Sequence, residues 1–209
     1  MYSVRYIAAL IVVVVAPPCL LWWLLIHPLA ILWRKLGWLS NGIVGILTYC
    51  LVFVLAAGTM RSLYKLRKDL LIIDFGTNYF IMTLSIIILA IGVVIYWKAK
   101  KQLTTGIQFG IPELLIYDYP SKLLTEWIYS KIRHPRYVAS ICAVLGYALL
   151  SNFKMSYIFA FFLEFGIYLI VIIEEKELRC RFGSDYEKYC QKVPRFLPKI
   201  SQKHSLNSI

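Results

Sequence analysis

The chain has 209 residues, of which 60% are hydrophobic, and it carries a formal net charge of +12. A soluble domain usually contains about 45–50% apolar residues, and the excess here falls in long runs, which argues against an ordinary soluble domain. The basic residues flank these runs, as expected beside anionic lipid headgroups, and no nucleic-acid-binding motif accompanies them.

The apolar runs predict an all-α integral membrane protein with about five transmembrane helices. The first covers about residues 7–26, and Pro17-Pro18 is expected to kink it, because proline removes backbone donors from the helix. Its apolar run is too long for a signal-peptide core, so we expect a retained anchor. The second covers about residues 43–60. The third covers about residues 79–97 and ends in a Tyr-Trp pair that suits the membrane interface.

The fourth and fifth helices are predicted at about residues 135–150 and 155–173. The link between them, residues 151–154, is so short that the two helices must form a tight antiparallel hairpin. The tail that follows has apolar residues at helical spacing and predicts an amphipathic helix interrupted near Gly183. One interpretation of this helix is that it lies on the bilayer surface with its basic side toward water.

Most of the 23 lysines and arginines flank the C-terminal side of this arrangement. The positive-inside rule therefore predicts a cytoplasmic C-terminus. The segment RSLYKLRKDL, residues 61–70, is the exception, because it places four basic residues on the opposite side. We expect one membrane domain over residues 1–209, with three helices in 1–97 and the chemistry in 98–209.

Five cysteines occur in the chain, and none forms a Cys-x-x-Cys pair. Free cysteine in an apolar run behaves as a small hydrophobic residue. The sequence therefore predicts neither a disulfide framework nor a metal site.

Two short motifs could carry chemistry. In IRHPRY, Pro135 fits the first turn of a helix, and the N–H groups of that turn with nearby arginines can bind an anion. The same pattern is also an ordinary start for a membrane helix. Glu174 and Glu175 directly follow the last predicted span, where they either pair with Arg133 or Arg136 or hold a ligand.

The run YSKIRHPRY at 129–137, a helical hairpin, EEKELRCRFGSDYEKY at 174–189 and VPRFLP at 193–198 occur in this order. Together they resemble the isoprenylcysteine carboxyl methyltransferase family, which is related to the membrane phospholipid methyltransferases. The resemblance covers about the last ninety residues. It implies a membrane enzyme that binds S-adenosylmethionine on the cytoplasmic side and methylates a lipid or prenylated acceptor entering from the bilayer.

By this resemblance the cofactor-binding residues are Tyr129, His134, Pro135, Arg136, Tyr137 and Glu174, with backbone contacts from the loop ending at Leu124. Arg133, Glu175 and Glu164 are expected to hold the acceptor or to support the site. The sequence names no catalytic residue and leaves the oligomeric state open.

Two positions bear on the acceptor. The family carries an arginine four residues before the first glutamate of the pair, and here that position is Ile170. Glu164 falls near the middle of the fifth span, where an acid costs about 2.5–3.5 kcal/mol on insertion scales. It is expected either to line an acceptor cavity or to bond a hydroxyl such as that of Thr83 or Ser85.

Three functions remain open from the sequence. The first is methylation of an isoprenylcysteine carboxylate or of a phospholipid amine. The second is reduction by an NADPH-dependent enzyme with a similar C-terminal hairpin. The third is a membrane protein without activity. Binding of S-adenosylmethionine, of NADPH or of neither separates them.

Overall fold

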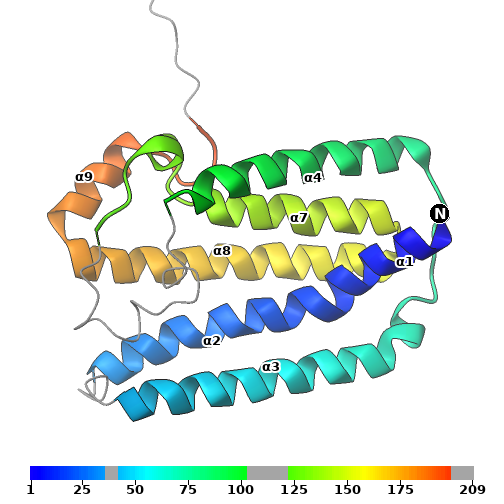
Figure 1. Cartoon of the computed structure of the whole chain (residues 1–209), viewed down its shortest axis with the longest axis horizontal. Coiled ribbons are helices and arrows are strands. Elements are labelled where there is room, and N and C mark those ends of the chain that lie inside the picture. The colour runs from blue at the N-terminus through cyan, green and yellow to red at the C-terminus, as the bar shows by residue number, and fades with distance from the viewer. Residues whose placement is uncertain (36–41, 103–121, 199–209) are drawn as a thin grey trace, which may run out of the picture.

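The computed structural model describes residues 1–35, 42–102 and 122–198 of the chain. In this part the chain folds into a bundle of long, roughly parallel and antiparallel helices (Figure 1). The helical elements are α1 (Tyr2–Leu10), η1 (Ile11–Val15), α2 (Ala16–Lys35), α3 (Gly42–Leu70), α4 (Tyr79–Lys100), η3 (Trp127–Ser130), α7 (Pro135–Ser151), α8 (Lys154–Phe182) and α9 (Ser184–Lys192).

Four stretches of the described chain are long and apolar enough to cross a membrane, namely Tyr2–Ile26, Ile43–Leu70, Tyr79–Lys100 and Lys154–Phe182. The shorter apolar helix α7 has 17 residues and is about 26 Å long at 1.5 Å per residue. That length nearly matches the ~30 Å hydrocarbon core of a bilayer. The predicted all-α membrane fold with about five spans is confirmed.

The first span is helical without a break despite Pro17 and Pro18, because α1, η1 and α2 follow one another directly. A π-helical stretch, η1, ends at Val15, two residues before the first proline. A proline ring clashes with the carbonyl four residues earlier, and the wider π-turn makes room for it within the helix. The backbone irregularity therefore lies just before the predicted kink.

The second span is longer than the sequence predicted, because α3 runs on from Met60 to Leu70. Polar residues interrupt the apolar run at this point, but they do not prevent the helix from continuing. The basic side chains in the last turn of α3 also interact favourably with the negative end of the helix dipole. Residues 61–70 are thus the end of a helix and not a loop.

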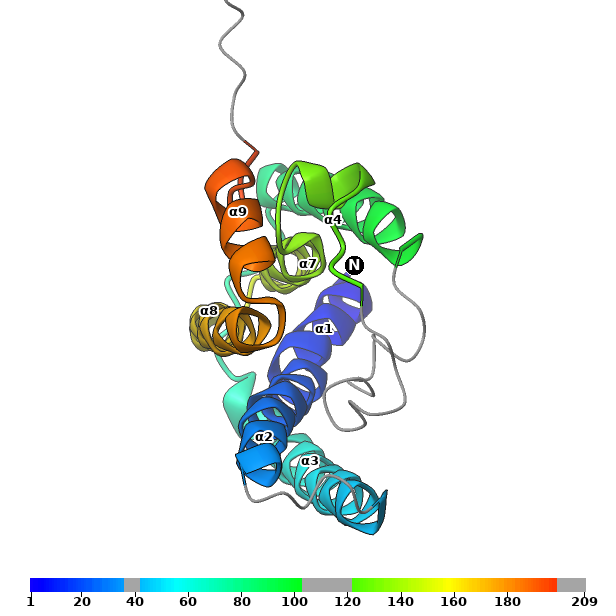
Figure 2. The ribbon, with the colours of Figure 1, turned by 90° about the vertical axis from the view of Figure 1, so that its left-hand side faces the viewer.

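Helix α7 lies at the centre of the bundle, between α4, α8 and α1 (Figure 2). Its contact with α4 is close because small residues meet there. A Cβ atom on Gly92 would come within 2.9 Å of the Cys142 Cβ, and one on Gly146 within 2.6 Å of the Leu89 Cγ. Glycines allow such close approach between membrane helices. Helix α3 packs on the outer side of α2.

The predicted hairpin of α7 and α8 is confirmed. Asn152 ends α7 in the left-handed conformation with φ 56° and ψ 39°. At this end of the bundle Arg5 is buried, pairs with Asp74 and donates to the Ser151 carbonyl at 3.0 Å. These contacts join the N-terminal helix, the link before α4 and the hairpin turn.

We call the opposite end of the bundle the α9 end. Here α8 is longer than the hydrocarbon core of a bilayer is thick. Its 29 residues span about 43 Å, against a hydrocarbon core of about 30 Å. Gly183, with φ 51° and ψ −127°, then turns the chain into α9. The apolar residues of the tail do not form a bilayer-facing surface, because Tyr186, Tyr189 and Val193 pack with Leu178 and Leu123.

Candidate functional site

A cavity at the α9 end is formed by segments that lie far apart in the sequence. The segment 122–137, the end of α8 and helix α9 each contribute walls. Its lining residues are Lys122, Leu123, Leu124, Tyr129, Arg133, His134, Pro135, Arg136, Tyr137, Glu174, Glu177, Leu178, Arg181, Phe182, Tyr186 and Tyr189. We call this the interfacial cavity.

The residues that the resemblance assigned to a cofactor all lie in this lining. They are Leu124, Tyr129, His134, Pro135, Arg136, Tyr137 and Glu174, and Arg133 lies beside them. Glu175 and Glu164 are absent from the described lining. The predicted loop at 98–133 is described only at its two ends, because residues 103–121 lie outside the described part of the chain.

The two adjacent glutamates of α8 have different surroundings. Successive residues of an α-helix point about 100° apart, so neighbours face different sides of the helix. Glu174 lines the interfacial cavity, whereas Glu175 is 1% exposed and points into a cluster of cations behind it. The residue types alone could not separate these two carboxylates, whereas the family resemblance assigned Glu174 to the cofactor and Glu175 to acceptor binding or support.

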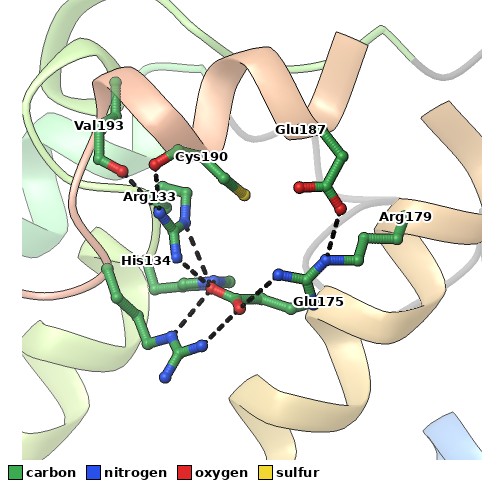
Figure 3. A network of polar contacts seen from close by, with 8 residues as sticks. Arg133, His134, Glu175, Arg179, Glu187, Cys190 and Val193 are labelled. Atoms are coloured by element: carbon green, nitrogen blue, oxygen red, sulfur yellow. Dashed lines mark hydrogen bonds and ion pairs between the residues drawn. The ribbon is translucent and has the colours of Figure 1, made fainter. Parts of the chain in front are cut away.

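Glu175 is the centre of a buried ionic network, shown in Figure 3. Its Oε1 accepts from Arg133 Nη2 at 2.8 Å and from Arg195 Nε at 3.0 Å, and its Oε2 accepts from Arg195 Nη2 at 2.6 Å. The Nε2 of His134 lies 3.1 Å from Oε1. The hydrogen bond to Glu175 also raises the pKa of Arg195. Glu175 therefore supports the cavity wall from behind.

The segment Val193–Arg195 is tied to the start of α7 by the same network. Arg133 Nη1 donates to the Val193 carbonyl at 2.6 Å and to the Cys190 carbonyl at 3.2 Å. The backbone N–H groups of Arg133 and His134 donate to the carbonyls of Pro194 and Arg195. The C-terminal segment thus fixes the residues that precede the α7 N-terminus.

Tyr129 presents a neutral aromatic side chain to the cavity. Its pKa is raised to about 12, mainly by burial, so the phenol stays protonated near neutral pH. Its backbone carbonyl accepts a 2.6 Å hydrogen bond from the Tyr189 hydroxyl of α9. Tyr129 can therefore offer a ring face or a hydroxyl donor, and α9 holds it in place.

Several lining residues were missed by the sequence analysis. Glu177 is 5% exposed and pairs with Arg181 at 3.5 Å, and Tyr186 and Tyr189 reach the cavity from α9. Their helical spacing in the sequence places the two tyrosines on one apolar face of the predicted tail helix. That signal predicts burial but does not say whether the face meets lipid or protein.

A second, largely apolar cavity lies within the bundle and adjoins the first. Its walls come from η1, α2, α7 and α8, and Arg136 and Tyr137 line both cavities. The lining residues are Ile11, Val12, Val15, Ala16, Cys19, Leu20, Trp23, Arg136, Tyr137, Ser140, Ala143, Val144, Tyr147, Leu163, Ile167 and Ile170. We call this the intramembrane cavity.

Ile170 lies in the wall of the intramembrane cavity, whereas Glu164 lines neither cavity in the described part of the chain. The Glu164 Oε1 is buried without a hydrogen-bond partner among the described residues. The hydroxyls of Thr83 and Ser85 instead donate to carbonyls of their own helix, those of Tyr79 and Met82. The structure shows no role for Glu164.

The chain is similar in sequence to known methyltransferases. Residues 79–185 match the family model described as "Phospholipid methyltransferase". A "Probable protein-S-isoprenylcysteine O-methyltransferase" of Oryza sativa subsp. indica is 30% identical over 149 residues, which cover 71% of this chain and 76% of the rice protein. The "Protein-S-isoprenylcysteine O-methyltransferase" of Schizosaccharomyces pombe is 38% identical over 79 residues, or 37% of this chain and only 34% of the yeast protein. No solved structure matches the chain.

Proposed function

The chain belongs to the phospholipid methyltransferase family of membrane proteins, and we propose that it is an S-adenosylmethionine-dependent methyltransferase with an isoprenylcysteine-type acceptor. One observation carries the proposal. The seven residues assigned to the cofactor come from two segments about forty residues apart, and they line a single cavity at the α9 end of the bundle. S-adenosylmethionine would supply an electrophilic methyl group there.

The chemistry of the lining residues fits this cofactor. Glu174 offers a carboxylate for the amine or the ribose hydroxyls, and Tyr129 and Tyr137 offer ring faces for adenine or for a sulfonium by a cation–π contact. The first turn of α7 begins at Pro135 and presents N–H groups suited to a carboxylate. The protein's contribution to rate is then to hold the reacting groups in line.

The intramembrane cavity suits the apolar part of the acceptor. It extends along the helix from Ile11 to Trp23, roughly 18 Å at 1.5 Å per residue. Val15 and Cys19 of its wall are exposed at the bundle surface, so an acceptor can enter from the bilayer. We propose that the cofactor enters at the α9 end from the cytoplasm, and that the two meet beside Arg136 and Tyr137.

The first test is binding of S-adenosylhomocysteine to the detergent-solubilised protein by calorimetry. The wild type is expected to bind it, and Glu174→Ala is expected to lose at least about tenfold in affinity, because a charged hydrogen-bond partner is removed. Lys176→Ala is the matched control, since Lys176 is exposed and is not among the described lining residues.

The same measurement separates the proposal from its alternatives. A folded wild type that binds NADPH and not S-adenosylhomocysteine would contradict the methyltransferase proposal and favour a reductase. Binding of neither compound would leave only the family fold. Cofactor binding together with methyl transfer to a phospholipid amine would keep the cofactor assignment and replace the acceptor.

A further inference from the structure

The intramembrane cavity is closed at the end that lies away from the interfacial cavity. In that direction Tyr147 is the last described lining residue of α7, and Leu163 is the last of α8. Directly beyond them Ala148 and Ala160 are buried, and both belong to one core cluster with Val12 and Leu163. A close-packed core leaves no room for an apolar chain to continue.

Tyr147 forms the largest part of this end wall. Its side chain packs against the same core cluster and lines the cavity. Long side chains of an α-helix lean toward the N-terminus of their helix, and α7 begins at the α9 end with Pro135. The ring of Tyr147 therefore leans into the cavity, toward the interfacial cavity.

The position of the wall sets a length. Tyr137 lines both cavities and lies ten residues before Tyr147 on α7, which is about 15 Å at 1.5 Å per residue. A polypeptide gains at most about 3.6 Å over three bonds, so an extended chain advances roughly 1.2 Å per bond, and the cavity holds about 12 bonds. Three isoprene units in a row have a main chain of about this length, whereas four units have about 16 bonds.

The cavity also opens to the side, where Val15 and Cys19 are exposed at the bundle surface. Both residues lie along the middle of the wall that the first span contributes. A chain with its head at Tyr137 therefore passes this opening before it reaches Tyr147. A fourth unit can leave the cavity only by bending back to the opening, and a chain of three units needs no such bend.

We propose that Tyr147 is a specificity-determining residue that sets the length of the acceptor chain, and that the cavity selects a prenyl chain of three isoprene units over one of four. This inference rests on the proposed function, because it takes the intramembrane cavity as the acceptor site.

The test measures how well S-prenyl N-acetylcysteines with two, three or four isoprene units protect Cys19 from a maleimide. Cys19 lines the cavity and is exposed, so a ligand that fills the cavity shields its thiol. Protein that keeps only this cysteine is used in detergent, and it gives an apparent affinity for each compound. Longer chains also partition more strongly into detergent, but this effect cancels when the ratio of two affinities is compared between variants.

Two variants move the wall in opposite directions. Tyr147→Ala removes it and is expected to raise the affinity for four units relative to three by at least about fivefold. Val144→Phe builds a wall seven residues after Tyr137, at about 10 Å, and is expected to shift the preference toward two units. Because the two variants make opposite predictions, the proposal stays testable where one of them does not fold.

Tyr147→Phe is the first control, because it keeps the ring that forms the wall. Leu145→Ala is the second control, since it removes an apolar side chain of α7 that is not among the described lining residues. Both are expected to keep the wild-type ratio of affinities. Thermal unfolding shows that each variant is folded, and binding of S-adenosylhomocysteine is measured separately on each.

Two results would overturn the proposal. The first is an unchanged ratio in folded Tyr147→Ala, which would mean that a fourth unit leaves freely through the side opening. The second is a folded wild type in which none of the three compounds protects Cys19, which would remove the acceptor from this cavity. A length preference that depends on Tyr147 in a protein that does not bind S-adenosylhomocysteine would support this inference and contradict the proposed function.

Discussion

At the residue scale, Glu175 shows how one side chain can serve a site without lining it. Its carboxylate holds Arg133, His134 and Arg195 within hydrogen-bond distance, and two of these three belong to the cavity wall. Removing one member of a buried ionic group leaves uncompensated charge behind, at a cost of about 3–5 kcal/mol. Glu175→Ala is therefore expected to unfold at a lower temperature and to bind S-adenosylhomocysteine more weakly.

Glu187→Gln is the control for this prediction. Glu187 also pairs with an arginine, at 2.9 Å from Arg179, but its side chain is 53% exposed, and surface pairs contribute about 0–1 kcal/mol. Thermal unfolding in detergent, followed with calorimetry of S-adenosylhomocysteine, measures both variants. Equal stability of Glu175→Ala and Glu187→Gln would show that the network does not hold the cavity wall.

The same residue marks a limit of the sequence analysis. The motifs around His134 and Glu174 led to the residues of the interfacial cavity, because their types and order are specific. The resemblance assigned Glu174 to the cofactor and Glu175 to acceptor binding or support, but no pattern in the sequence indicated that Arg195 pairs with Glu175. The motifs also could not place Tyr186 and Tyr189, whose partners lie sixty residues away in the chain, at Leu123 and Tyr129.

At the element scale, the turn between α8 and α9 depends on Gly183. Its φ of 51° with ψ of −127° lies in a region that residues with a Cβ rarely adopt. A Cβ at this position would meet no atom within 4 Å, so Gly183→Ala tests the backbone conformation alone. Strain of about 1–3 kcal/mol is expected, and α9 would shift together with the tyrosines that line the cavity.

The expected result for Gly183→Ala is weaker binding of S-adenosylhomocysteine with the spans intact. Gly45→Ala is the matched control, because Gly45 lies within helix α3 and also has no atom within 4 Å of a built Cβ. Calorimetry gives the affinity of both variants, and circular dichroism gives their helix content. Unchanged affinity in Gly183→Ala would mean that α9 does not need this turn to form the cavity.

At the scale of the whole molecule, periodicity and apolar length predicted the spans well, because burial in lipid demands long apolar helices. The same signals misjudged where α3 ends, since a helix can continue into the interface with Arg61 and Lys65 on its surface. Periodicity and apolar length also could not predict which helices pack against one another. The central place of α7 depends on close contacts such as that of Gly92 with Cys142, which a single sequence does not reveal.

The charges at the two ends of the bundle predict its orientation in the membrane. The α9 end carries the basic residues of α9 and of the last turns of α4 and α8. The opposite end has the basic turns of α3, but Arg5 there is buried against Asp74 and contributes little free charge. By the positive-inside rule, the α9 end is expected to face the cytoplasm.

Cysteine labelling tests this orientation with residues already in place. Cys180 is exposed near the end of α8, and Lys154 is exposed at the other end of the same helix. A variant that keeps only Cys180 is expected to react with a membrane-impermeant maleimide only after spheroplasts of a bacterial host are permeabilised. A cysteine-free variant carrying Lys154→Cys is expected to react in intact spheroplasts. The reverse pattern would put the basic end of α3 in the cytoplasm, and the interfacial cavity would then face away from the cellular supply of S-adenosylmethionine.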